Sequence, residues 1–436
     1  MVNQNKNKII LKKGKKIIPG GSLLFSKKSE LFLHDEWPSY FSKAKGSDVW
    51  DLNNKKYLDM YFGVGTNTLG YANPKIDKAV MDRIKKSNMS TLNNPQEVEL
   101  AEKLVSLHSW SDMAWFARSG GEANSIAIRI ARAASGKDNV AICGYHGWHD
   151  WYLSVNLNSN NSLKSHLLDG LTTDGIPKSL KKTVFPFNYN DYDHLCKLVE
   201  RHNIGTIKME VCRSTKPNKN FLQKVRKLAT KKNIVLIFDE CTSGFRESYG
   251  GLHKKYGIYP DLAMFGKALG NGYAITSVIG RKEVMESIHN TFISSTFWTE
   301  AVGPAAALKT LELMHKYKSW KYISNFGKNI KQNWLSIANN NNLDIKLGGI
   351  DALPSFQLPY KNFMKYKTFI TQELLKNNIL GSNLVFVSMA HNEKNILKYY
   401  DILNKTFSKI KKFEDGLDIN NYLKANVAQS GFKRLN

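Results

Sequence analysis

A single lysine, Lys267, stands between an apolar run and a glycine-rich turn in the stretch 261–272. Upstream, the apolar run 234–238 ends in two carboxylates, Asp239 and Glu240. A buried lysine that has lost its proton can form a Schiff base with an aldehyde. A carboxylate at the end of a core strand can hold a protonated pyridine nitrogen. These two groups are what pyridoxal 5′-phosphate (PLP) requires of a protein, so we take Lys267 and Asp239 as candidate catalytic residues.

A second candidate is the stretch 117–124, which predicts a turn from a strand into a helix. Gly120 and Gly121 let the backbone approach a ligand closely, and the first amides of a helix have no partners within it. This combination favours phosphate, with Ser119, Gly120 and Gly121 as ligands. The alternative is a plain turn in which Ser119 caps the helix.

The stretch 144–150, Gly-Tyr-His-Gly-Trp-His-Asp, follows the next apolar run. Tyr145 could lie flat against a planar cofactor ring. The spacing of His146, His149 and Asp150 could suggest a metal site. All three stand on one glycine-containing loop with no further ligand nearby, so we expect no metal.

Between about residue 75 and residue 315 the chain alternates between helical patterns, such as 97–107, and short apolar runs. Continuous apolar strands between helices predict an α/β fold with a mostly parallel sheet covered on both faces. Ligands of such sheets bind at the carboxyl ends of the strands, where the candidate residues stand. The predicted strands are 113–116, 140–143, 206–211, 234–238, 262–265 and 275–279.

We expect three sections along the chain. Residues 1–70 form an N-terminal arm and part of a small domain, with a hairpin at 46–59 around an Asn-Asn turn. Residues 71–315 form the large domain that binds the cofactor. Residues 316–436 form the rest of a smaller α+β domain.

The composition limits the location and the kinds of binding partner that we expect. The chain has 436 residues, 42% of them hydrophobic, and four scattered cysteines without CxxC spacing, which fits a reducing cytoplasm. We find no apolar run long enough for a membrane helix and no signal peptide, and expect a soluble, cytoplasmic protein without membrane partners. The net charge of +26 could indicate nucleic-acid binding, but the lysines are spread along the chain, and compositional bias is the favoured explanation.

Five motifs occur in one order: Ser-Gly-Gly-Glu-Ala-Asn at 119–124, Tyr-His-Gly at 145–147, the stretch 236–246, Phe-Gly-Lys-Ala-Leu-Gly-Asn-Gly at 265–272, and Ser-Ser-Thr-Phe at 294–297. This ordered set resembles the class III aminotransferases, PLP enzymes of fold type I. Within that class it resembles the glutamate-1-semialdehyde 2,1-aminomutase branch. The resemblance implies a large domain with a mostly parallel mixed sheet, a smaller α+β domain, and PLP as cofactor.

The resemblance also implies roles for the residues that match its motifs. Lys267 matches the Schiff-base lysine and Asp239 the partner of the pyridinium nitrogen. The phosphate-binding turn is matched at 119–121, and Tyr145 matches the aromatic residue on one ring face.

Three further residues match with qualifications. Cys241 matches a position, usually valine, on the other ring face, and Glu210 matches a glutamate usually followed by proline, whereas Val211 follows here. Thr296 matches a threonine that reaches the phosphate of the neighbouring subunit, which implies a homodimer with shared active sites.

Several positions depart from the family pattern. Arg118 and Gly121 replace a usual asparagine and threonine, and Trp298 and Glu300 replace small residues at the site edge or at an interface. The segment 22–28 offers Lys27 and Lys28 where the aminomutase has an arginine that we expect to bind the substrate carboxylate. Lysine is no equivalent of that bidentate fork, which argues against glutamate 1-semialdehyde as the substrate.

The favoured function is therefore a PLP-dependent transaminase acting on another carbonyl compound, such as a keto-sugar of surface-polysaccharide synthesis. The alternative is a glutamate-1-semialdehyde aminomutase of tetrapyrrole synthesis, and a distant one is a basic nucleic-acid-binding protein without catalysis.

Overall fold

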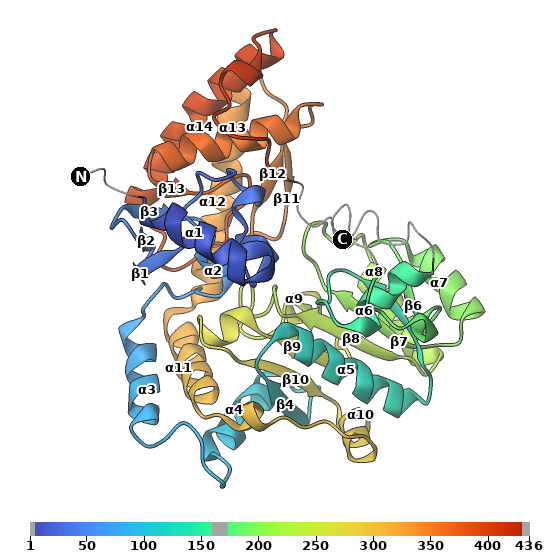
Figure 1. Cartoon of the computed structure of the whole chain (residues 1–436). Helices are drawn as coiled ribbons and strands as arrows, with labels where there is room; N and C mark the ends of the chain where they lie inside the picture. Colours follow the sequence, from blue (N-terminus) through green and yellow to red (C-terminus); the bar gives the residue numbers. More distant parts are fainter. Residues whose placement is uncertain (1–4, 159–172, 430–436) are drawn as a thin grey trace. The chain divides into compact units, whose positions relative to one another are not determined.

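The computed structural model describes residues 5–158 and 173–429. These residues divide into two compact units. The first consists of residues up to 73 together with those from 322 onward, and the second of residues 74–321 (Figure 1). In the described part of the chain, no helix is long and apolar enough to cross a membrane.

The second unit is built on a seven-stranded sheet with the order β4-β10-β9-β8-β7-β5-β6. Strands β5 to β9 run parallel to one another, whereas β10 runs antiparallel to both β4 and β9. The predicted mostly parallel sheet is thus confirmed. The strands are β4 (Met113–Ala117), β5 (Asn139–Cys143), β6 (Val184–Pro186), β7 (Ile204–Glu210), β8 (Val235–Glu240), β9 (Leu262–Phe265) and β10 (Thr276–Gly280).

All six strands expected from the sequence are present, within two residues at either end. Strand β6 was not predicted, because its three residues are too few to show a periodicity. The predicted helix at 97–107 is also present and begins two residues earlier, at Pro95, with the Asn94 side chain accepting a hydrogen bond from the Gln96 amide.

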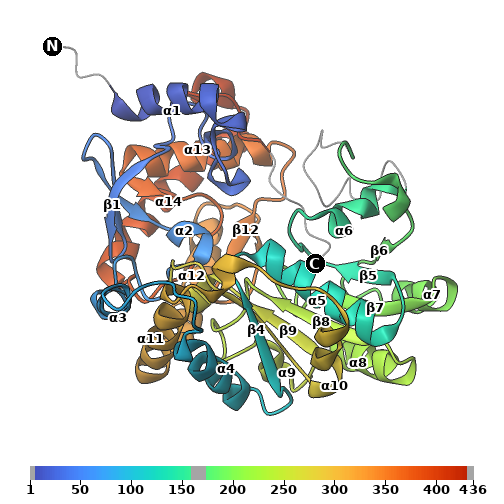
Figure 2. The same cartoon turned by 60° about the horizontal axis from the view of Figure 1, so that its bottom comes forward.

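Helices flank this sheet (Figure 2). They are α3 (Pro74–Ile84), α4 (Pro95–Leu107), α5 (Gly120–Ser135), α6 (Asp150–Leu153), α7 (Tyr192–Arg201), α8 (Phe221–Lys231), α9 (His253–Tyr256), α10 (Lys282–Met285) and α11 (Val302–Tyr317). The 3₁₀ turns are η4 (Ser154–Leu157), η5 (Lys178–Leu180), η6 (Lys267–Gly270), η7 (Glu286–Asn290) and η8 (Thr296–Thr299).

Helix α5 packs across β7, β8, β9 and β10. Val235 and Ile237 of β8 share one hydrophobic cluster with Ile126 and Ile130 of α5. Because side chains alternate along a strand, Phe238 and its even-numbered neighbours face the opposite side of the sheet. The same alternation sends Asp239 towards the α5 side and Glu240 away from it.

In the first unit, strands from the N-terminal and C-terminal parts of the chain form one four-stranded sheet, with the order β1-β2-β3-β13. The predicted hairpin is confirmed: β2 and β3 are antiparallel and are joined by a turn in which Asn54 has a positive φ of 62°. Strand β13 pairs in parallel with β3. The strands are β1 (Phe41–Lys45), β2 (Asp48–Asp51), β3 (Lys56–Asp59) and β13 (Ile379–Leu380), beside a separate pair, β11 (Lys346–Gly348) and β12 (Ser355–Gln357).

Helices account for most of the rest of this unit. They are α1 (Lys6–Ile17), α2 (Phe62–Gly65), α12 (Ser319–Asn340), which begins before residue 322, α13 (Phe363–Lys376) and α14 (Glu393–Glu414). The 3₁₀ turns are η1 (Pro19–Gly21), η2 (Phe25–Lys27), η3 (Ser29–Leu31) and η9 (Ile419–Asn421).

Candidate active site

Lys267 begins the turn that follows β9. Its backbone has a φ of 40°, in the left-handed region that residues with a Cβ seldom adopt, and such strain clusters at functional positions. Its Nζ donates a hydrogen bond of 2.7 Å to the hydroxyl of Thr242, two residues beyond the end of β8. The carbonyl of Thr242 accepts a 2.6 Å hydrogen bond from Nε of Arg246, which fixes this turn. The structure thus brings Lys267 to the carboxyl end of the neighbouring strand.

Asp239 lies in that strand and is buried. One oxygen accepts a hydrogen bond from the Cys241 amide (3.1 Å), and the other accepts one from Nδ1–H of His146 (2.9 Å). Nζ of Lys208 lies 4.0 Å from that second oxygen. Burial alone would raise the pKa of the Asp239 carboxyl, but the Lys208 charge and the His146 hydrogen bond outweigh it and hold this pKa well below its usual range. The carboxylate is therefore ionised and suited to a cationic partner.

Glu240, the second carboxylate of the pair, serves the fold. It accepts hydrogen bonds from the amides of Leu252 and His253 and from Nδ1–H of His253. Nε2 of His253 in turn accepts a hydrogen bond from the Trp110 indole (3.0 Å). Glu240 is fully buried on the opposite face of the sheet from Asp239, where these bonds satisfy it.

The predicted phosphate turn forms the start of α5. Ser119 caps the helix: its hydroxyl accepts a hydrogen bond from the Glu122 amide, and the Glu122 carboxylate accepts one from the Ser119 amide at 2.7 Å. The plain capping role considered above is therefore present. A Cβ on Gly120 would lie 3.8 Å from Sγ of Cys241, and one on Gly266, beside Lys267, would lie 3.5 Å from the same sulfur. Cys241 thus links the start of α5 to the turn that carries the lysine.

Tyr145 and Glu210 are also brought together. Glu210 is buried at the end of β7, in register with Asp239 of β8, and accepts a 3.2 Å hydrogen bond from the Tyr145 amide. Gly144 has a φ of 114°, and a Cβ there would lie 2.8 Å from the Glu210 carboxylate. Only glycine allows this close approach, which sets the Tyr145 loop against β7.

Gly121, which stands where the family usually has threonine, lies against the side chains of a neighbouring loop. A Cβ on Gly121 would lie 2.8 Å from Nε2 of His149 and 3.4 Å from the Trp148 indole nitrogen. The His149 ring is held by Ser125 of α5, whose hydroxyl lies 2.5 Å from its Nδ1. The imidazole therefore fills the space that a larger residue at 121 would need.

Arg118, Trp298 and Glu300 form one connected group. Nε of Arg118 lies 2.9 Å from the Glu300 carboxylate, and its Nη2 donates to the carbonyls of Trp298 and Glu300, both at 2.8 Å. The Trp298 indole donates a 3.0 Å hydrogen bond to Glu122. These bonds hold the turn η8 against the start of α5. Thr296, the first residue of this turn, is exposed.

The structure adds site residues that the sequence did not single out. Lys208 is the foremost, because it is fully buried in β7 beside Asp239. A charged residue inside an otherwise apolar strand run was the available signal. His146 was considered only as a metal ligand, whereas its ring orients Asp239. In the ranges 5–158 and 173–429, no cluster of three His, Cys, Asp or Glu residues could hold a metal ion.

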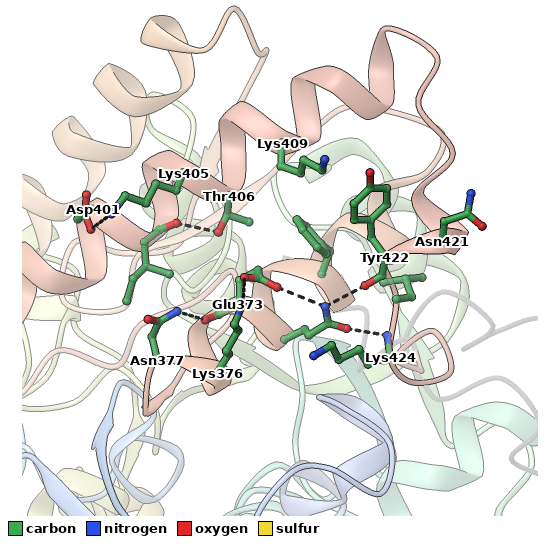
Figure 3. Close-up of a pocket in the computed structure, with 14 residues that line it drawn as sticks. Glu373, Lys376, Asn377, Asp401, Lys405, Thr406, Lys409, Asn421, Tyr422 and Lys424 are labelled. Atoms are coloured by element: carbon green, nitrogen blue, oxygen red, sulfur yellow. Dashed lines mark hydrogen bonds and ion pairs between the residues drawn. The ribbon is translucent and has the colours of Figure 1, made fainter.

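A cavity of about 670 Å³ borders the start of α5, with Glu122, His149 and Trp298 in its lining. A cavity of about 520 Å³ lies in the other unit, lined by α13, α14 and the segment 421–424 (Figure 3). Two of its lysines are engaged locally: Lys405 pairs with Asp401 at 2.7 Å, and Nζ of Lys409 lies 4.1 Å from the centre of the Tyr422 ring. It contains none of the residues predicted to do chemistry, so the assignment rests on the chemistry of the residues at the sheet edge.

Comparison with known proteins identifies the family. The family model of class-III aminotransferases matches residues 33–371. The chain belongs to this family. Its members use PLP, so the chain is a PLP-dependent aminotransferase of fold type I, as the motifs predicted.

Curated relatives include both transaminases and aminomutases. A 3-aminobutyryl-CoA aminotransferase of Cloacimonas acidaminovorans is 28% identical over 418 residues, covering 92% of this chain and 97% of that protein. A glutamate-1-semialdehyde 2,1-aminomutase of Methanobrevibacter smithii is 33% identical over 333 residues, covering 73% of this chain and 76% of that protein.

Solved structures show the same fold. The PLP-bound form of the FumI protein of Sphingopyxis sp. MTA144 superimposes with a TM-score of 0.85 at 23% identity, covering 96% of this chain and 99% of that chain.

Proposed function

We propose that this aminotransferase moves an amino group from an external donor to a carbonyl acceptor, with Lys267 as covalent anchor and proton carrier and Asp239 as partner of the cofactor ring nitrogen. The observation that carries this proposal is the bond from Lys267 Nζ to Thr242, three residues beyond the ionised, buried Asp239. The ends of two adjacent strands thus offer both groups that PLP needs.

The residues present fit this cofactor. The start of α5 at Ser119, Gly120 and Gly121 would take the phosphate, because the first amides of a helix have no acceptors within it and carry a partial positive charge. Tyr145 and Cys241 would contact the two faces of the ring. Glu210 is proposed to act indirectly, by holding the Tyr145 loop through its amide.

Each residue then has a chemical task. PLP, when bound, accepts the electrons left behind when a proton leaves the substrate. Lys267 Nζ takes that proton and returns it, as a general base and acid positioned by Thr242. Asp239 stays ionised under its two neighbours and keeps the ring nitrogen protonated. His146 orients the carboxylate through its Nδ1–H.

We further propose a homodimer in which Thr296 serves the phosphate site of the partner. The exposure of Thr296 and the family resemblance support this proposal. Mixing the inactive variants Lys267→Ala and Thr296→Ala tests it, because a mixed dimer would contain one intact site. Recovery of activity on mixing is expected. No recovery in mixed dimers verified by mass would show that Thr296 acts within its own subunit.

The acceptor is proposed to be a carbonyl compound other than glutamate 1-semialdehyde, with a keto-sugar carried on a nucleotide as the first compound to test. The net charge of +26 favours an acidic or phosphorylated acceptor, and the segment 22–28 lacks the arginine expected of the mutase. The aminomutase of M. smithii at 33% identity keeps glutamate 1-semialdehyde isomerisation as the second candidate.

The absorption spectrum of the purified protein, before and after addition of L-glutamate, separates these functions. A transaminase that uses glutamate loses the yellow band of bound PLP when the donor is added. A band that persists with glutamate but responds to glutamate 1-semialdehyde identifies the mutase. A protein that takes up no PLP refutes both.

Variants test the assigned roles. Lys267→Ala is expected to lose borohydride-trappable cofactor and turnover, whereas the exposed Lys282→Ala keeps both. Asp239→Asn is expected to bind PLP but to slow proton abstraction, because the ring nitrogen loses its charged partner. Trapped cofactor in Lys267→Ala, or normal turnover in Asp239→Asn, contradicts the corresponding role.

A further inference from the structure

Lys208 is a charged residue in the middle of the sheet. It lies in β7, all seven residues of which are buried, and its own side chain has no exposed surface. A lysine is seldom buried without a partner, because removing an ammonium group from water is costly. A specific interaction must therefore hold it there.

Its partners lie on the two adjacent strands. In register, Asp239 of β8 stands next to Glu210 of β7 on one side and Met264 of β9 on the other, so these three side chains share the α5 face with Lys208. Nζ of Lys208 donates to Sδ of Met264 at 2.8 Å and lies 4.0 Å from the same Asp239 oxygen that His146 contacts.

The charges around this carboxylate can be counted. Burial lowers the pKa of His146, with its hydrogen bond to Asp239 opposing, so the ring is neutral at neutral pH. Asp239 is ionised, and a charged Lys208 balances it. A protonated ring nitrogen at Asp239 would place a second positive charge on the same buried carboxylate. Two positive charges that meet at one buried carboxylate disfavour each other, and although Glu210 on the same face opposes the loss, one proton becomes easier to release.

Lys208 is the group that can release it. Burial lowers the pKa of Lys208, while the charges of Asp239 and Glu210 oppose this shift. A neutral amine can still donate to Met264 and to Asp239. The ring nitrogen, in contrast, needs its proton to draw electrons from the substrate.

We propose that Lys208 is a positioning residue: its ammonium group is the counter-ion of Asp239 in the protein without cofactor, and it releases one proton to solvent when the ring nitrogen takes its place. This proposal rests on the role proposed above for Asp239. It makes Lys208 responsible for keeping Asp239 ionised and in position before the cofactor arrives.

Proton release during binding tests the proposal directly. The probe is 4′-deoxypyridoxine 5′-phosphate, which has the ring nitrogen and the phosphate but no aldehyde, so no reaction with Lys267 contributes protons. Calorimetric titrations at one pH, in two buffers of different ionisation enthalpy, give the number of protons released. The wild type is expected to release about one proton more than Lys208→Arg, whose guanidinium can balance Asp239 but keeps its proton. Equal numbers would overturn the proposal.

Relative affinities give a second readout that does not depend on counting protons. Lys208→Arg keeps the counter-ion but cannot lose its proton. It is expected to bind the probe at least tenfold more weakly than the wild type. Its affinity for the analogue with a carbon in place of the ring nitrogen should be unchanged relative to the wild type, which separates charge from size. Wild-type affinity for the probe, or an equal loss for both analogues, would contradict the proposal.

Asp239→Asn distinguishes failure of this inference from failure of the assigned site. If Asp239 holds the ring nitrogen, the variant loses the preference for the nitrogen-containing probe over its carbon analogue. A retained preference would refute the role of Asp239 itself. A lost preference with no effect of Lys208→Arg would refute the inference alone.

Discussion

Replacing Gly121 with threonine, the residue usual in the family, should weaken cofactor binding in this chain. The new Cβ would lie 2.8 Å from Nε2 and 3.1 Å from Cδ2 of His149. Since ordinary contacts are about 3.5 Å, the imidazole would have to move by about 0.7 Å. That movement disturbs its 2.5 Å contact with Ser125, and Gly147 of the same loop already packs on Gly121.

The free-energy cost of this overpacking should appear as weaker binding of PLP. Without cofactor, the loop 144–150 can relax away from α5, but the bound cofactor requires both the start of α5 and Tyr145 in place. Overpacking of this kind costs roughly 1–3 kcal/mol, which corresponds to about a 5- to 150-fold higher dissociation constant for PLP. The assay is a spectroscopic titration of PLP into the protein without cofactor, with thermal unfolding to verify the fold.

A double variant supplies the control. His149→Ala removes the ring that obstructs the threonine, so Gly121→Thr should have little further effect in that background. The reasoning is refuted if Gly121→Thr binds PLP as tightly as the wild type, or if the two substitutions have additive effects.

Two further predictions concern stability. Burial lowers the pKa of His108 from 6.5 to about 4, although the hydrogen bond from its Nδ1–H to the Leu104 carbonyl opposes this shift; its Nε2 carries no proton, because it accepts from the Gly251 amide. Between pH 7 and pH 5 the unfolded chain binds a proton at His108 that the folded chain does not bind. The free energy of unfolding of the wild type should therefore fall by about 2 kcal/mol more than that of His108→Gln over this pH range, measured by denaturant unfolding. Equal losses would contradict this. Glu300→Gln leaves the half-buried charge of Arg118 without its ionic partner. It should lower the free energy of unfolding by about 1–3 kcal/mol, seen as a lower Tm. An unchanged Tm would show that the ion pair contributes nothing to stability.

Much of the fold and of the site could be predicted from the sequence. Six strands of the main sheet and the hairpin around Asn54 were expected, because apolar periodicity and turn residues are local properties. The order of motifs identified the family, and with it the cofactor. The chemistry of Lys267 and Asp239 follows from their residue types and from their positions after apolar runs.

Other features depend on neighbours that are distant in the chain. Adjacent carboxylates in a strand face opposite sides, but only the packed structure shows that Glu240 faces His253 and that Asp239 faces the α5 side. The pairing of β13 with β3, which joins the two ends of the chain, likewise has no local signal.

The sequence by itself therefore determined the family, the cofactor and the residue types that react, because these are written in local motifs. Only the tertiary structure decided which charges meet. Lys208 is one lysine among many in a chain with a net charge of +26, and its sequence neighbours are apolar. It becomes the neighbour of Asp239 because β7 and β8 pair in register, and interactions across strands depend on that register rather than on sequence spacing.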